Sequence, residues 1–228
     1  PAGVAAGVYA SRKRLKTLLV TEHFEGQSSV SEGIENYSID IQNASTAAPI
    51  LILDNTFQGA TGDDDFFKMA IRLNTVTDMD ITVSGCKFYD FGNAALVGGT
   101  NVISITGGSS TGSFVITNCI FRNCISASNL NVILASSTAS AAFVLTIDNC
   151  IFRNCDSSSV ATSNIISLSL IGSTRISNCT FQNITDMRCI SATSCVSVHV
   201  FGCTAGRGTT ALNAGFIQAT NNTFELLV

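Results

Sequence analysis

A short motif that ends in phenylalanine recurs along this chain about every thirty residues. Its eight copies end at Phe24, Phe57, Phe88, Phe121, Phe152, Phe181, Ala205 and Phe224. The spacing between successive copies drifts from 33 residues near the start to 19 near the end. A repeat of this length with a drifting spacing is typical of stacked coils that are joined by loops of different lengths. The chain is therefore predicted to fold as a solenoid.

Within the motif, the residue types change in a way that predicts two strands joined by a tight corner. Three residues before the final position, seven of the eight copies have Gly, Asn or Asp, which are the types that tolerate positive φ. Before that corner, aliphatic residues alternate with polar ones, as in a strand with one buried face. After it, a Cys column and the Phe column lie two residues apart, so both are expected to point inward.

Stacked coils place equivalent residues about 4.8 Å apart, so that each column becomes a ladder of like side chains. The third strand of each coil is predicted around residues 66–73, 131–135 and 164–170. The fold class is therefore predicted to be all-β, a right-handed parallel β-helix of about seven to eight coils. It is expected to cover residues 18–228, with residues 1–17 as an N-terminal lead-in or cap, and to be a segment of a longer protein.

Composition narrows the range of partners. Charged residues make up only 12 % of the chain, and the abundant Ser, Thr, Asn and Gly favour strands and turns over amphipathic helices. A net charge of −4 creates no positive field to hold a nucleic-acid backbone, so nucleic acid is not expected as a partner. Since no stretch approaches the ~18 apolar residues of a membrane-spanning helix, no direct membrane span is expected either.

The nine cysteines fall into two columns and a remainder. The first column contains Cys86, Cys119, Cys150, Cys179 and Cys203. In-register neighbours about 4.8 Å apart exceed the ~3.8 Å Cβ separation of a disulfide, so free buried thiols are expected there. Cys124 and Cys155 form the second column, at a turn that bends more readily, and are the candidate disulfide. No Cys-x-x-Cys pair occurs and the two histidines lie in different coils, so no metal or cofactor is expected.

The densest group of candidate ligands is Asp63-Asp64-Asp65, followed by Lys68 and Arg72. Three adjacent carboxylates could help to hold calcium, and the two cations could neutralise an acidic sugar, which makes this a candidate glycan- or calcium-binding site. The alternative is a solvated loop that leads into a strand. The catalytic strings of polygalacturonases do not occur together in the chain, so no catalytic residue is assigned.

Arg122 and Arg153 occupy equivalent positions in neighbouring coils and are expected to point outward. Stacked like charges repel unless an anion lies between them, so the pair is a candidate anion-binding site. Separately, Asn-x-Ser/Thr sequons mark candidate glycosylation sites on a secreted protein. These candidates are Asn36, Asn43, Asn183 and Asn221.

The string Ile-Thr-Asn118-Cys-Ile-Phe121-Arg-Asn123 and its counterparts resemble the parallel β-helix repeat of pectin-lyase-like proteins, over roughly residues 18–228. That superfamily includes polysaccharide lyases and hydrolases, phage tailspikes and surface adhesins, and the coils rich in Cys and Asn are most similar to adhesins of the polymorphic-membrane-protein type. Fold and function are loosely coupled in such scaffolds.

The resemblance and the columns lead to one hypothesis and two alternatives. The first hypothesis is a noncatalytic extracellular or cell-surface β-helix that serves as a structural spacer or adhesin, with glycans or other surface proteins as partners. The first alternative is a polysaccharide lyase or glycoside hydrolase that uses the Asp63 to Arg72 region. The second is a subunit that associates end to end into a filament, since the repeat runs on to Val228 with no polar cap.

Overall fold

A computed structural model describes residues 39–42, 49–59, 69–74, 77–92, 100–107, 111–157, 163–206, 216–221 and 223–227. These residues belong to one compact unit, Ser38–Val228. The expected lead-in, residues 1–17, and the first copy of the motif lie outside the described residues. No described residue is helical, and the strand pairs of the described part are parallel.

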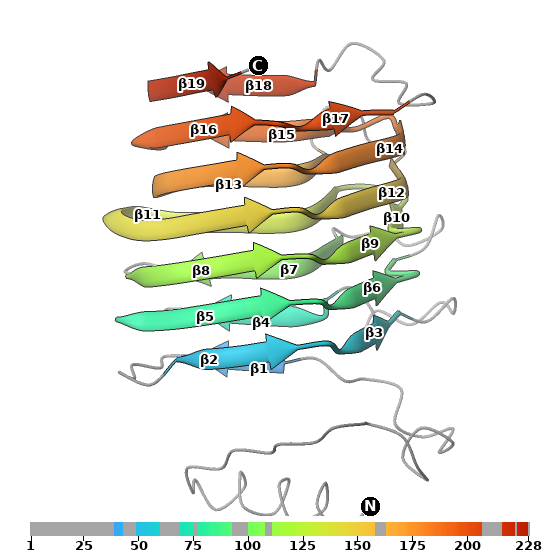
Figure 1. Cartoon of the computed structure of the whole chain (residues 1–228), viewed down its shortest axis with the longest axis horizontal. Coiled ribbons are helices and arrows are strands. Elements are labelled where there is room, and N and C mark those ends of the chain that lie inside the picture. Colours follow the sequence, from blue (N-terminus) through green and yellow to red (C-terminus); the bar gives the residue numbers. More distant parts are fainter. Residues whose placement is uncertain are drawn as a thin grey trace, which may run out of the picture. The chain divides into compact units, whose positions relative to one another are not determined.

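The strands stack in three faces (Figure 1). Face 1 contains β1 (Ile39–Gln42), β4 (Ile71–Asn74), β7 (Thr100–Gly107), the first part of β11 (Leu130–Asp148), the first part of β13 (Asn164–Ser177), β15 (Arg188–Thr193) and β18 (Ile217–Thr220). Face 2 contains β2 (Ile50–Leu53), β5 (Met79–Ser84), β8 (Gly112–Thr117), the later parts of β11 and β13, β16 (Ser197–Phe201) and β19 (Thr223–Leu227). Face 3 contains β3 (Thr56–Gln58), β6 (Lys87–Tyr89), β9 (Ile120–Arg122), β12 (Ile151–Ser157), β14 (Thr180–Thr185) and β17 (Thr204–Ala205), and the short β10 (Ile125–Ser126) pairs with the end of β12.

The path of the chain makes this stack a right-handed parallel β-helix. In Figure 1 the chain rises from β2 to β19, while the near strand β5 runs to the right and the fainter, more distant β4 runs to the left. Each coil therefore visits face 1, face 2 and face 3 in turn before it returns one step higher. The predicted fold class, an all-β parallel solenoid, is confirmed.

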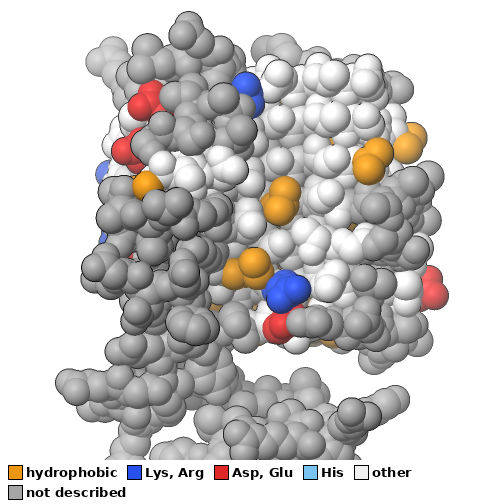
Figure 2. Space-filling model, turned by 180° about the vertical axis from the view of Figure 1, so that it is seen from behind, with side chains coloured by type: hydrophobic (Ala, Val, Ile, Leu, Met, Phe, Trp, Pro, Cys, Tyr) orange, Lys and Arg blue, Asp and Glu red, His pale blue; other side chains and the backbone are white. Residues whose placement is uncertain are grey.

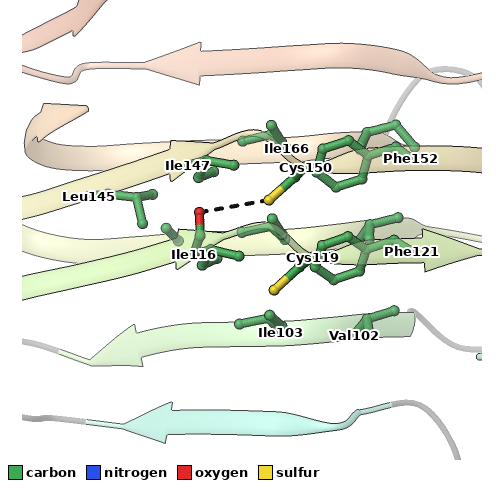
Figure 3. Packing of buried hydrophobic residues seen from close by; sticks show 14 of the residues in the cluster. Val102, Ile103, Ile116, Cys119, Phe121, Leu145, Ile147, Cys150, Phe152 and Ile166 are labelled. Atoms are coloured by element: carbon green, nitrogen blue, oxygen red, sulfur yellow. Dashed lines mark hydrogen bonds between the residues drawn. The ribbon is translucent and has the colours of Figure 1, made fainter. Parts of the chain in front are cut away.

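The interior is filled by ladders of like residues, as the motif predicts. Five phenylalanine rings from face 3 stack nearly parallel, with centroid separations of 4.9, 4.6, 4.9 and 5.1 Å in chain order. They belong to Phe57, Phe88, Phe121, Phe152 and Phe181. Figure 3 shows how Cys119 and Cys150 lie beside two of these rings, with the Cys150 thiol donating to the carbonyl oxygen of Ile116 in the coil below at 3.7 Å. Each coil thus buries its apolar side chains on the next.

The corner between face 2 and face 3 has positive φ in each described copy of the repeat. The angles are 53° at Asp54, 67° at Gly85, 55° at Asn118, 50° at Asn149, 54° at Asn178 and 62° at Gly202. Asn149 also donates from Nδ2 to Oδ1 of Asn118 at 2.7 Å. At Gly85 a Cβ atom would overlap the carboxylate of Asp54 in the coil below, which adds a steric reason for glycine to its positive φ. The predicted corner column is confirmed.

The last copy of the motif takes a different place from the one its sequence suggests. β19 pairs with β16, which puts Phe224 opposite Val198 in face 2 rather than next to Ala205 in face 3. Asn221 does have positive φ, 55°, but it follows β18 and turns the chain from face 1 to face 2. An Asn-x-Thr-Phe string suits either corner, so the prediction that Phe224 continues the phenylalanine column is wrong. The ring of Phe216 instead meets Phe181 edge-on, with centroids 5.3 Å apart.

Candidate functional site

Face 3 carries a straight outward column that we call the arginine rank. It consists of Gln58, Tyr89, Arg122, Arg153 and Gln182, which follow one another in register. β9 and β12 place Arg122 and Arg153 opposite each other, as predicted, and both side chains are exposed. Among the described residues neither guanidinium has a carboxylate partner. Their backbones stand one strand spacing apart, about 4.8 Å, and like charges on neighbouring strands are an unfavourable pair unless an anion is present.

Tyr89 supports this pair from the coil below. The guanidinium carbon of Arg122 lies 4.9 Å from the centroid of the Tyr89 ring. A cation held over an aromatic face is attracted by the ring, and the contact also restricts the rotamers of the long arginine side chain. Arg122 is thus partly ordered before any ligand arrives.

A second outward column, the flanking rank, runs beside the first. It consists of Lys87, Ile120, Ile151 and Thr180. Lys87 adds a third cation to face 3, and the side chain of Ile151 is 40 % exposed, although it is large and apolar. Cations and exposed aliphatic surface therefore lie side by side on this face.

A third column, the asparagine rank, borders the arginine rank on its other side. Asp90, Asn123, Asn154 and Asn183 all have positive φ, from 52° to 58°. Asn183 donates from Nδ2 to Oδ1 of Asn154 at 3.0 Å, Asn154 to Asn123 at 3.2 Å, and Asn123 to the carboxylate of Asp90 at 2.8 Å. Each asparagine amide donates one N–H within this ladder, and its second N–H can donate to another acceptor. Sequence reasoning missed this rank, although Phe followed two residues later by Asn or Asp marks it in four copies.

The acid at the end of this ladder is already occupied. Asp90 accepts from Asn123 at one oxygen and from Gln58 Nε2, 2.6 Å away, at the other. Its carboxylate is thereby engaged by amides. Among the described residues of face 3, the outward cations are Lys87, Arg122 and Arg153.

The other charged candidates lie elsewhere. Asp63, Asp64, Asp65 and Lys68 are outside the described residues, so the glycan or calcium site predicted there stays a prediction. Arg72 is described: it points outward from face 1 and lies 3.9 Å from a carboxylate oxygen of Asp40 in the neighbouring strand.

The outward side of face 1 is mostly uncharged. Figure 2, which views the molecule from behind, shows this side covered largely by uncharged polar side chains and backbone, drawn in white. One of its columns consists of Thr106, Ser136, Ser169, Thr193 and Thr220. Among the described residues, charge at a regular spacing is thus a feature of face 3 and not of face 1.

Eight of the nine cysteines are buried in the described coils, and Cys203 is partly exposed. No disulfide is formed in this structure, and the column that begins at Cys86 places one cysteine in each of five coils, as predicted. Cys124 and Cys155 are neighbours, as predicted, and the pKa of Cys124 is raised by its hydrogen bond with the Cys155 thiol and then by burial. Their disulfide stays a prediction. Burial also raises the pKa of Cys189, to about 12.

Two of the candidate glycosylation sites can be placed. Asn183 and Asn221 are both exposed, whereas Asn36 and Asn43 lie outside the described residues. The Nδ2 atom of Asn183, which would carry the glycan, already donates to Asn154. A glycosylated amide keeps one N–H, so this hydrogen bond and a glycan are compatible.

Within the described residues, no three His, Cys, Asp or Glu side chains come together in a way that could hold a metal ion. The same part of the chain contains no helix of the length and hydropathy needed to span a membrane. Comparison of the chain with protein-family models, with curated proteins and with solved structures finds no match.

Proposed function

We propose that this chain is a noncatalytic extracellular or cell-surface β-helix that serves as a structural spacer or adhesin. The observation that carries the proposal is the in-register pairing within each face, which shifts between β11 and β13 only where these strands pass from face 1 to face 2. It turns outward residues from distant parts of the sequence into straight ranks, such as the one that joins Tyr89, Arg122 and Arg153. Straight ranks on a rigid stack suit a protein that holds a surface in place or presents it to a partner.

The same observation supports kinship with the pectin-lyase-like superfamily and, within it, with adhesins. The sequence of the repeat resembles those proteins. The asparagine ladders at two corners and the stacked phenylalanines are regular structural features of the same repeat. In the described coils, the outward residues also form regular columns, and most of these columns are polar. Since fold alone does not decide function, the biological role needs a direct test.

An extracellular location fits the chemistry of the outer surface. Short hydroxyl and amide side chains form its ranks on face 1, and exposed Asn183 and Asn221 lie in sequons that a secretory pathway would recognise. Labelling of intact cells of the natural source with an antibody to this chain tests the location. We expect labelling without permeabilisation, and labelling only after permeabilisation would contradict the proposal.

The absence of catalysis is tested with a panel of acidic and neutral polysaccharides, each incubated with and without calcium. We expect no release of reducing ends and no unsaturated products. Turnover that disappears in an Asp64→Ala variant would overturn the proposal in favour of a lyase or hydrolase.

A further inference from the structure

We propose that the column of cysteines that begins at Cys86 binds a soft monovalent cation, Cu(I), at its C-terminal end, between the sulfur atoms of Cys179 and Cys203. The proposal goes beyond the spacer or adhesin role and does not depend on it. It is carried by the equivalent placement of the two thiols, by their surroundings and by the exposure of Cys203.

The two thiols occupy equivalent positions in neighbouring coils. The strands on both sides of Cys179 and Cys203 are paired, so the two cysteines are in register. The Cys179 sulfur lies 3.2 and 3.8 Å from carbonyl oxygens of its own coil and of the coil below, and the Cys203 sulfur lies 3.6 and 3.9 Å from the corresponding oxygens one coil higher. Figure 3 shows the same arrangement for Cys119 and Cys150 farther down the column. Because the side chains are oriented alike, their sulfur atoms keep the strand spacing, about 4.8 Å.

This separation suits a bridging ion better than a disulfide. The sulfur atoms of a disulfide are about 2.05 Å apart, whereas two metal–thiolate bonds of about 2.3 Å, the length found with zinc, span about 4.6 Å when they lie in line. Soft thiolate ligands favour Cu(I) and zinc. Zinc takes four ligands, and the described residues bring no three suitable side chains together. Cu(I) is stable with two ligands in line, so it is the cation that the pair fits.

The charge balance also favours a monovalent cation, since a net charge is costly in the apolar interior. Hydrogen bonds with the thiols of Cys150 and then Cys203 lower the pKa of Cys179, which makes Cys179 the member of the pair that releases its proton. Cu(I) then binds the Cys179 thiolate and a lone pair of the Cys203 sulfur. One proton leaves as one positive charge arrives, so the net charge of the site is unchanged. The nearby carboxylate of Asp148 acts on this pair and attracts a cation.

The C-terminal end of the column is also the end that a solute can reach. Cys203 is partly exposed, whereas the other four cysteines of the column are buried. In the described part of the chain β17 is the last strand of face 3, because β18 and β19 continue only faces 1 and 2. A cation can therefore meet the Cys203 sulfur first and then bridge to Cys179 in the coil below.

The test is a titration of the full chain, reduced and under nitrogen, with Cu(I) in competition with a chromophoric Cu(I) chelator. The variants Cys203→Ala and Cys179→Ala each remove one ligand. The matched control is Cys86→Ala, which removes a thiol from the buried opposite end of the same column. Thermal unfolding without copper checks the fold of each variant, and Cys203→Ala should keep the fold because its side chain is only partly buried.

We expect the parent to compete with the chelator for Cu(I), and each ligand variant to weaken the affinity at least about a hundredfold, since even the partners of metal ligands are worth up to that factor. Cys86→Ala, several coils away, should change it less than about threefold. X-ray absorption of the complex should show two sulfur neighbours and no nitrogen or oxygen ligand. Cu(I) should raise the Tm of the parent and not that of Cys203→Ala.

Four results would overturn the inference. They are no competition by the parent, full affinity in Cys203→Ala, an equal loss of affinity in Cys86→Ala, and nitrogen or oxygen ligands in the absorption spectrum. None of them bears on the spacer or adhesin role, which the cell-labelling and polysaccharide assays test separately.

Discussion

Replacement of Thr174 by valine should stabilise this protein. Thr174 is fully buried in an inward column of face 2, between Leu145 and Val198, and its hydroxyl has no hydrogen-bond partner. Valine has nearly the same shape as threonine and is apolar like the neighbours Leu145 and Val198, so the packing is kept. The variant removes a desolvation cost of about 1–3 kcal/mol, which for a chain of this size corresponds to a rise in Tm of roughly 2–12 °C.

Urea unfolding and thermal unfolding, followed by circular dichroism, measure this effect. The control is Thr146→Val, the same chemical change on the same face at a partly exposed outward position, which should stay within about 0.5 kcal/mol of the parent. If Thr174→Val proves neutral or destabilising while the control behaves as expected, the hydroxyl must be satisfied inside the core, and the reasoning is refuted.

Two further perturbations test the ladders, and a third tests a buried thiol outside them. Phe121→Ala removes a fully buried ring stacked at 4.6 and 4.9 Å on its neighbours, and should cost about 3–5 kcal/mol in urea unfolding; a loss under about 1 kcal/mol would mean that the ring is not buried in a stack. Asn149→Ala places alanine at φ 50° and loses the hydrogen bond to Asn118, so the free energy of unfolding should fall by about 2 kcal/mol. Asn149→Gly loses the same hydrogen bond without the backbone strain and should cost about half as much. Equal losses in the two variants would contradict the strained corner. Burial raises the pKa of Cys189 from 9.0 to about 12, so the folded state holds the thiol proton more tightly and its stabilising effect is complete below pH 9 and lost as the pH rises toward 12. Between pH 7 and pH 10 ionisation of this thiol in the unfolded state should lower the stability by roughly 1 kcal/mol, and the Cys189→Ala variant should lose correspondingly less stability over that range. An unchanged pH dependence would count against a buried thiol.

The columns that recur with one residue type in each coil could be predicted from the sequence. Cys119 and Phe121 lie two residues apart after a corner at Asn118, and that spacing alone places both side chains on the inner face. The outward position of Arg122 follows from the same alternation. Such columns are predictable because the constraint is local and is repeated along the chain.

Other features depend on pairing between coils and could not be read in this way. The string before Phe224 resembles the earlier copies, yet its register is decided by which strand β19 joins. The contact between Arg122 and Tyr89 depends on side-chain direction, and so does the capture of Asp90 by Gln58 and Asn123. Without these contacts, Arg122 and Arg153 would be only two like charges on neighbouring strands; with them, the pair is a candidate binding site.

The stack itself can be tested most directly by NMR of protein labelled only at phenylalanine. The structure predicts ring-to-ring nuclear Overhauser effects between Phe88 and Phe121 and between Phe121 and Phe152, whose centroids are 4.6 and 4.9 Å apart, with none between Phe88 and Phe152. If the contacts between residues 31 and 33 positions apart are missing, or Phe88 contacts Phe152 directly, the coils are not stacked in this register. The arginine rank would then not exist.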